Sequence, residues 1–133
     1  MSLKKTDSAG NKPPIPHQSL NMVFDLIIGR KIAEAEKLLQ EIEINFKENI
    51  KSDFDIGFIR ALKGIILMYK SGDQSSSFLN NLNLNDAGVL RKYYSEFLEF
   101  SMDDLHSNYD RGYFSALSQF MLFALRKLES RRK

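Results

Sequence analysis

The chain partly repeats itself. Segment 52–62, SDFDIGFIRAL, returns later in the chain as segment 107–117, SNYDRGYFSAL. Both copies fit the pattern S-x-F/Y-D-x-G-F/Y-I/F-x-A-L, and six of the seventeen positions in 52–68 are identical in 107–123. Repeated supersecondary units are typical of helical arrays whose members bury their apolar faces on each other. The repeat therefore constrains architecture first, and function only indirectly.

The same offset also relates the residues before each copy, because it aligns Lys37 with Lys92. We therefore predict that the repeating unit is a helical hairpin, present as residues 31–70 and again as residues 86–130. The alternative is that two unrelated helices meet one packing requirement with similar residues. The matching positions favour a duplicated hairpin.

Prolines and turn signals divide the chain into an arm and one domain. All three prolines lie within residues 1–17, a polar segment that we expect to be a flexible arm. Residues 18–133 contain no proline and few turn dipeptides, which favours α-helices over strands. A chain of 133 residues has the size of a single domain. The predicted fold class is all-α: a bundle of about five helices, built from two related antiparallel hairpins plus an N-terminal helix.

Apolar spacing predicts further helices outside the repeat. We expect the N-terminal helix to break at Gly29, because Arg30 and Lys31 form a polar corner. Another helix is predicted for residues 86–104, with Leu105 on its apolar side. The apolar stripe of the N-terminal helix consists of Leu20, Val23, Phe24, Ile27 and Ile28.

Each repeated helix begins with a residue that can cap it. Ser52 or Asp53 is expected to cap the first, and Ser107 or Asn108 the second. A short side-chain oxygen at this position accepts a hydrogen bond from the free amides of the first turn. Asp55 adds negative charge at the positive end of the helix dipole.

The connection between the copies is rich in serine and asparagine. We expect Gly72 to end the first repeated helix in the left-handed conformation. Phe78, Leu79 and Leu82 could then form a short helical turn that docks under the connection.

Glycine and alanine recur four positions apart in both copies, which places two small residues on one helix face. Glycine inside a helix costs about 1 kcal/mol relative to alanine, so a packing reason is expected. One interpretation is a groove that receives a partner's helix or peptide; the alternative is that each hairpin packs internally there. The candidate groove residues are the small residues and the aromatic residues that bracket them: Phe54, Gly57, Phe58, Ala61, Tyr109, Gly112, Tyr113 and Ala116.

Both repeated helices continue into segments that are apolar on most sides, residues 65–68 and 121–125. Helices of this kind are usually central, so we place both in the middle of the bundle. The alternative for 121–125 is that one side of the helix forms a dimer interface, which methionine and phenylalanine suit.

No arrangement of residues indicates an enzyme. Neither His17 nor His106 has a partner at the spacing of a helical metal site. Phosphate-cradling and nucleophile motifs such as G-x-x-x-x-G-K-S/T and G-x-S-x-G do not occur. Asp53 and Asp55 resemble a D-x-D triplet, but helix capping explains both carboxylates. We therefore predict no catalytic residues, no metal ligands and no cofactor.

The absence of cysteine excludes disulfides and thiolate chemistry and suits a reducing cytosol. The first residues lack the apolar core of a signal peptide, and no apolar run reaches the roughly 20 residues that a membrane span needs. The prediction is a cytoplasmic protein without a membrane partner.

Charge is distributed unevenly along the chain. The formal net charge of +2 is too small for a bulk attraction to nucleic acid, but segment 34–48 is acidic and the C-terminus is basic. The basic residues could simply complement the helix dipole, or they could hold phosphates together with Arg91 and Lys92 if the two helix ends meet. The candidate phosphate contacts are Arg126, Lys127, Arg131, Arg132 and Lys133.

Two segments resemble the tetratricopeptide repeat family. Residues 29–39 are similar to the loop and second-helix start of such a repeat, with Ala35 where the family places a small residue, and residues 61–69 are similar to the first helix of a following unit. The two copies in this chain are spaced more widely than the repeats of that family, whose period is about 34 residues. The resemblance implies a helical-hairpin adaptor that binds proteins.

Taken together, these patterns favour a non-catalytic protein-interaction module, an adaptor or scaffold that could self-associate as a homodimer. The alternative is an RNA- or ribosome-associated factor that contacts nucleic acid with its basic C-terminal helix end. An enzyme is the third interpretation.

Overall fold

The computed structural model describes residues 12–71 and 82–131. Within these residues the chain forms five α-helices and one 3-10 turn, η1 (Lys47–Asn49), and no strand. The predicted all-α fold class is confirmed. The helices are α2 (His17–Ile28), α3 (Ile32–Asn45), α4 (Asp53–Ser71), α6 (Ala87–Ser101) and α7 (Asn108–Arg131).

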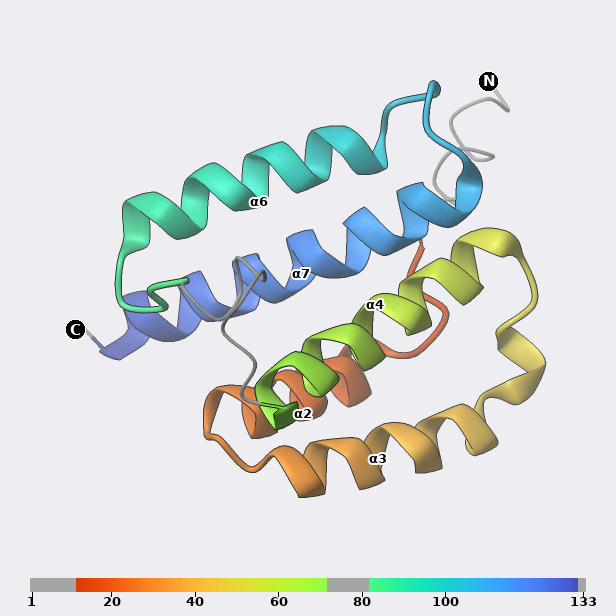
Figure 1. The fold of residues 1–133 in the computed structure, drawn as a ribbon, viewed down its shortest axis with the longest axis horizontal. Helices are drawn as coiled ribbons and strands as arrows, with labels where there is room; N and C mark the ends of the chain where they lie inside the picture. Colours follow the sequence, from red (N-terminus) through yellow and green to blue (C-terminus); the bar gives the residue numbers. More distant parts are fainter. Residues whose placement is uncertain (1–11, 72–81, 132–133) are drawn as a thin grey trace.

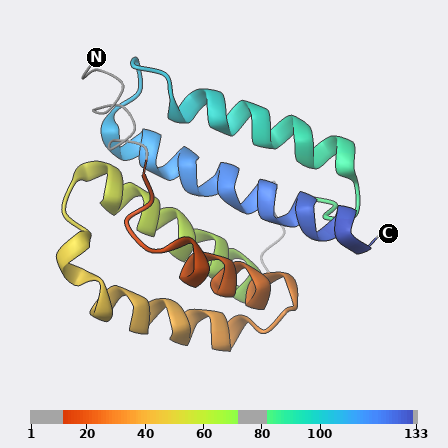
Figure 2. The same cartoon turned by 180° about the vertical axis from the view of Figure 1, so that it is seen from behind.

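Four helices lie side by side in the order α6, α7, α4, α3, and α2 lies on the face that Figure 2 shows (Figures 1 and 2). Helices α4 and α7 lie in the middle of this row, as we expected of the two most apolar helices. Both begin at the same end of the molecule and run in the same general direction. On the second face α2 packs against α3 and α7. Its Phe24 ring lies 5.2 Å from the Phe120 ring and 5.7 Å from the Phe123 ring, measured between centroids.

The predicted hairpins correspond to α3–α4 and α6–α7, and a serine caps the second helix of each. The Ser52 hydroxyl accepts a hydrogen bond from the Asp55 amide at 3.1 Å, and the Ser107 hydroxyl accepts one from the Asp110 amide at the same distance. The Asp55 carboxylate in turn accepts a hydrogen bond from the Ser52 amide at 3.2 Å, which completes a capping box. Both helices therefore begin at the serine of the repeated sequence.

The hairpins meet through a reciprocal contact at two glycines. Gly57 of α4 lies against the backbone of Tyr109 in α7, and Gly112 of α7 lies against the backbone of Phe54 in α4. A Cβ atom at Gly57 would lie 2.9 Å from the Tyr109 carbonyl carbon, and one at Gly112 would lie 2.8 Å from the Phe54 carbonyl carbon. Only hydrogen fits at either position. Each contact joins the same two positions of the repeat in exchanged roles, so the two copies of the sequence play equivalent parts.

This seam lies between the hairpins. The expectation that each glycine packs within its own hairpin is therefore wrong, because each glycine packs against the other hairpin. Helical periodicity identifies which face of a helix is buried, but any helix of the bundle can cover that face. Ala61 and Ala116, one turn after the glycines, are both 0% exposed.

The chain breaks between α2 and α3 at Gly29, as predicted. The residue in the left-handed region is Arg30, with φ of 65°, rather than the glycine. The Arg30 guanidinium lies 5.1 Å from the centroid of the Tyr69 ring, a cation–π contact between the α2–α3 turn and α4. Burial raises the pKa of the Tyr69 hydroxyl, and the positive charge of Arg30 opposes that rise.

Two boundaries differ from the sequence-based expectation. The packed chain reaches back beyond residue 18, because α2 begins at His17 and Ile15 is buried in the core beside the same helix. At the other hairpin, α6 ends at Ser101 rather than at residue 104, and Leu105 lies beyond it, 93% exposed. Leu82 is partly buried against the core. The expectations for Gly72, Phe78 and Leu79 lie outside the described residues.

The glycine seam can be tested by adding one methyl group. We expect Gly57→Ala and Gly112→Ala each to lower the free energy of unfolding by about 1–3 kcal/mol or more, because the Cβ would meet backbone that cannot move alone. Gly64→Ala is the matched control on α4. Its Cβ would meet only the Tyr113 hydroxyl at 3.4 Å, so the gain of up to about 1 kcal/mol in helix propensity should be retained. Urea unfolding curves of the three variants measure this. Equal stability of all three would contradict the close contact.

Candidate functional site

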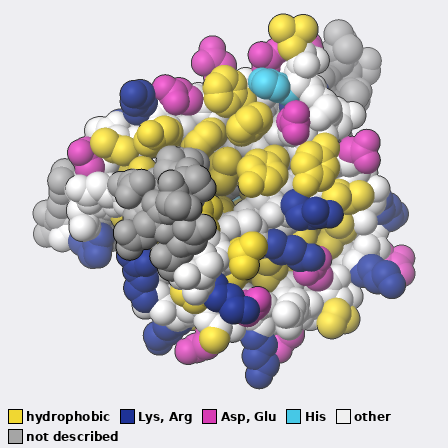
Figure 3. Space-filling view, in the orientation of Figure 1, with side chains coloured by type: hydrophobic (Ala, Val, Ile, Leu, Met, Phe, Trp, Pro, Cys, Tyr) yellow, Lys and Arg dark blue, Asp and Glu magenta, His cyan; other side chains and the backbone are white. Residues whose placement is uncertain are grey.

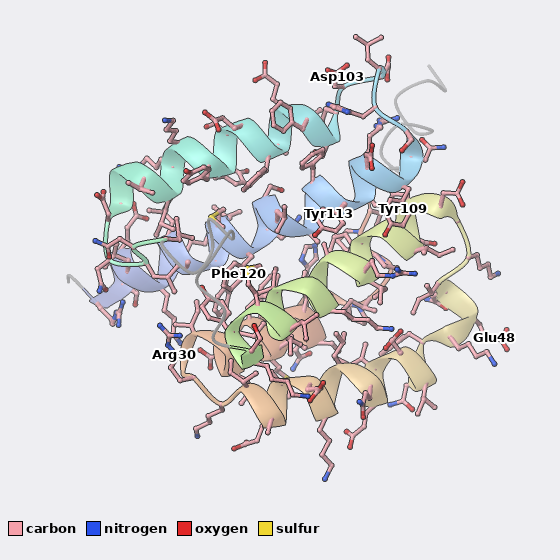
Figure 4. The ribbon with its side chains drawn as sticks, viewed as in Figure 1. Arg30, Glu48, Asp103, Tyr109, Tyr113 and Phe120 are labelled. Atoms are coloured by element: carbon pink, nitrogen blue, oxygen red, sulfur yellow. The ribbon has the colours of Figure 1, made fainter. Side chains whose placement is uncertain are left out.

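The structure places the eight candidate groove residues in the seam itself. Six of them are buried between the helices of the bundle: Phe54, Gly57, Phe58, Ala61, Gly112 and Ala116. Tyr109 and Tyr113 are partly buried and lie at the start of α7 beside α4 (Figure 4). Within this chain, α4 and α7 therefore fill the groove with each other, and the glycines offer no open face to a second molecule.

The described cations of the C-terminal helix end come together near α2 and α6, but acidic or polar residues accompany most of them. The Lys127 ammonium group is paired with the Asp25 carboxylate of α2 and lies 5.8 Å from the Phe123 ring centroid. The Arg131 guanidinium donates a hydrogen bond to the Asn85 amide oxygen at 3.5 Å. Arg126 is exposed. The remaining candidate phosphate contacts, Arg132 and Lys133, lie outside the described residues.

The condition under which Arg91 and Lys92 could join the C-terminal cations, that the two helix ends meet, is fulfilled. The Arg91 guanidinium lies 3.2 Å from the Glu129 carboxylate of α7, so the start of α6 does meet the end of α7. The two side chains are 59% and 48% exposed, and an exposed ion pair of this kind contributes little to stability. Glu129 also reduces the positive charge that a phosphate would meet.

A groove of about 630 Å³ runs between α2 and α7 beside these cations. Every polar side chain that lines it can donate a hydrogen bond, and no carboxylate is among the lining residues. Leu122 and Phe123 supply its apolar lining. The polar lining residues are His17, Asn21, Gln119, Arg126, Lys127 and Ser130.

A second surface feature is an exposed apolar cluster at the corner between α6 and α7. We call Phe100, Met102 and Leu105 the apolar tip; their exposed fractions are 38%, 59% and 93%. Figure 3 shows hydrophobic side chains gathered on the solvent face over α6 and this corner. Three large apolar residues exposed within one short segment differ from the single exposed aliphatic residues that any soluble protein carries.

Aromatic rings support the apolar tip from below. The Phe114 ring of α7 lies 5.0 Å from the Phe100 ring and 5.5 Å from the His106 ring, measured between centroids. On its other side, Phe114 stacks on Phe97 at 6.1 Å, and Phe97 stacks on Tyr93 at 5.8 Å. This row of rings supports Phe100, so that part of the tip would lose little conformational freedom when a partner binds it.

Local hydrogen bonds shape the corner and turn Leu105 outward. The Asp103 carboxylate accepts a hydrogen bond from the Leu105 amide at 2.9 Å, and the Asp103 carbonyl oxygen accepts one from the His106 amide at 3.1 Å. Arg111 fixes the end of α6, because its Nε atom donates to the Ser101 carbonyl oxygen at 3.0 Å. The corner, marked by Asp103 in Figure 4, is therefore a defined turn in which Leu105 is exposed.

The corresponding corner of the first hairpin has a different surface. At the offset of the repeat, Phe100 corresponds to Asn45 and Met102 corresponds to Lys47. Leu105 corresponds to Ile50, which is partly buried against the core. The same architecture therefore closes with polar residues at one corner and with exposed apolar residues at the other. The fold alone does not require an apolar tip.

Sequence reasoning missed this site. Leu105 was assigned to the buried side of a helix, and neither Phe100 nor Met102 was a candidate. The available signal was the contrast between the two copies, since a position that is polar in one and apolar in the other is not set by shared packing.

Residues 12–71 and 82–131 contain neither a metal-ligand cluster nor a membrane-spanning helix. No three or more histidine, aspartate or glutamate side chains in this part of the chain are placed to hold a metal ion. Among the same residues, no helix is both long enough and apolar enough to cross a membrane.

Comparison with known proteins adds no relative. No protein-family model, no curated protein sequence and no solved structure matches this chain.

If the apolar tip serves binding rather than folding, polar residues there should leave stability unchanged. We expect Met102→Ser and Leu105→Ser each to change the free energy of unfolding by less than about 0.5 kcal/mol, as at other exposed positions. Phe120→Ala, at a residue that is 0% exposed, should cost about 3–5 kcal/mol in the same assay. Thermal and urea unfolding measure all three variants. A loss at Leu105 well outside that range would mean that the tip packs against the rest of the chain.

Proposed function

We propose that this protein is a non-catalytic interaction module that binds a partner protein through its apolar tip. The observation that carries the proposal is the exposure of Phe100, Met102 and Leu105 at a corner whose counterpart in the first hairpin is polar. Aromatic residues and methionine are enriched in the centres of protein interfaces, where they fill pockets of the partner.

The architecture supports a role of this kind. Because Phe100 packs on a row of rings, this part of the tip is held in place before a partner binds, which lowers the entropic cost of binding. The resemblance of residues 29–39 and 61–69 to tetratricopeptide repeats points to the same class of adaptor. The partner in this proposal is a protein; a second copy of the chain is one form that it could take.

Photo-crosslinking at the tip tests the proposal. A crosslinking amino acid at position 105 is expected to capture a discrete protein from an extract of the source cells. Met102→Lys in the same chain should reduce that capture by about tenfold or more, because a buried charge at an interface centre costs more than about 1.4 kcal/mol. The product's mass identifies the partner, and twice the mass of the chain indicates self-association.

Position 67 is the matched control for crosslinking, since Leu67 is 63% exposed on α4, close to the exposure of Met102. Equal amounts of captured protein at positions 67 and 105 would refute the proposed role of the tip. An unchanged amount of captured protein in the Met102→Lys variant would refute it too.

A second candidate function is favoured by the groove between α2 and α7. Its lining of hydrogen-bond donors suits a phosphate-bearing polymer such as single-stranded RNA. The paired state of Lys127 leaves Arg126 as the principal free cation of the groove within the described residues.

Binding of a labelled RNA oligonucleotide, followed by fluorescence anisotropy at several salt concentrations, tests this candidate. Arg126→Gln should weaken binding and reduce the steepness of the salt dependence by about one phosphate contact. Lys63→Gln, which removes an equal charge from the α3–α4 surface, should have a much smaller effect. If Arg126→Gln binds like the unchanged chain, the groove is not an RNA site.

A further inference from the structure

We infer that the segment bound at the apolar tip is basic as well as apolar: it places lysine or arginine side chains beside its apolar anchors. This inference rests on the proposed function, since it specifies the partner of the same surface. The observation that carries it is the charge that surrounds the tip.

The tip lies within a strongly acidic stretch of the chain. Residues 96–111 carry five carboxylates and one guanidinium, a net charge of −4 in a chain whose formal net charge is +2. The Asp104 side chain is 96% exposed, so its charge is directed to solvent. The carboxylates are Glu96, Glu99, Asp103, Asp104 and Asp110.

The one cation of this stretch is occupied by the corner itself. The Arg111 side chain is 21% exposed, and its Nε atom donates to the Ser101 carbonyl oxygen. Its Nη1 atom lies 3.9 Å from the Asp104 carboxylate, which offsets part of one negative charge. Arg111 therefore stabilises the turn and leaves most of the acidic surface uncompensated.

The apolar tip and the C-terminal cations lie at opposite ends of α7 (Figure 1). Both interhelical corners lie at the end where α4 and α7 begin, and the corner of the first hairpin adds Glu48, Asp53 and Asp55 against two lysines (Figures 1 and 4). The C-terminal cations lie at the other end of α7 (Figure 1). The carboxylates near the tip are therefore separated from the C-terminal cations by the length of α7.

These two properties select one class of partner. Apolar side chains that cover the tip would supply most of the affinity, because interface energy concentrates in buried anchors. The surrounding carboxylates would attract a basic segment and repel an acidic one, which sets the rate of encounter and the specificity. At physiological ionic strength the screening length is about 8 Å, so these carboxylates act on a segment in contact with the tip.

Designed peptides test the inference on the full chain. The basic probe is a helical peptide of leucine and lysine, about five turns long, with leucine at positions i, i+3, i+4 and i+7; its matched control has glutamate in place of every lysine. Fluorescence anisotropy of labelled peptides should show that the chain binds the basic probe at least tenfold more tightly than the acidic one. Binding of the basic probe should weaken as salt is raised.

Variants of the chain locate that binding. Met102→Lys should weaken binding of the basic probe by about tenfold or more. Leu67→Lys introduces the same charge at a similarly exposed residue away from the tip and should have little effect on that binding. Asp103→Asn combined with Asp104→Asn should weaken binding of the basic probe several-fold and make that binding less dependent on salt.

The outcomes separate this inference from the proposed function. If the acidic probe binds as tightly as the basic one and both respond to Met102→Lys, the tip binds proteins but the inferred charge of the partner is overturned. If Leu67→Lys weakens the basic probe as much as Met102→Lys does, the attraction is diffuse and the inference is overturned too. The proposed function is refuted separately, if Met102→Lys does not reduce the amount of product crosslinked at position 105.

Discussion

The backbone of one central helix lies directly against a glycine of the other, twice, and this reciprocal contact determines how the molecule is assembled. Because Gly57 and Gly112 have no Cβ atom, α4 and α7 approach until backbone meets backbone at Tyr109 and Phe54. The side chains that follow on both helices are then buried between them, Phe58 among them at 0% exposed. A helix–helix contact of this kind has one register, since any shift would bring a side chain against the opposite backbone.

The position of the candidate site follows from that contact. Since the seam joins the first turns of α4 and α7, both helices begin at one end of the molecule. The chain enters each helix from an interhelical corner, and the two corners consequently share that end. The acidic residues of both corners therefore lie at that end, although they belong to different copies of the repeat and are far apart in the sequence.

Much of the fold was predictable because helix ends and buried helix faces are determined by residues that lie close together in the sequence. The break at Gly29, the serine caps and the two hairpins follow from capping chemistry and apolar periodicity, which depend on neighbours along the chain. The helix that packs against each glycine could not be predicted, because apolar periodicity identifies a buried helix face but not the element that covers it. The tip was missed for a related reason: Leu105 continues an apolar pattern, but the helix ends at Ser101 and the pattern no longer determines burial.

The contrast between the two corners connects stability to function. Asn45 and Lys47 show that a corner of this architecture closes with polar side chains, so folding does not account for Phe100 and Met102 in the other corner. An exposed apolar cluster promotes non-specific association unless nearby charges oppose it. In the inferred complex, the carboxylates near the tip would repel an acidic partner segment, while a basic segment could approach. These charges would therefore restrict which partners can cover the tip.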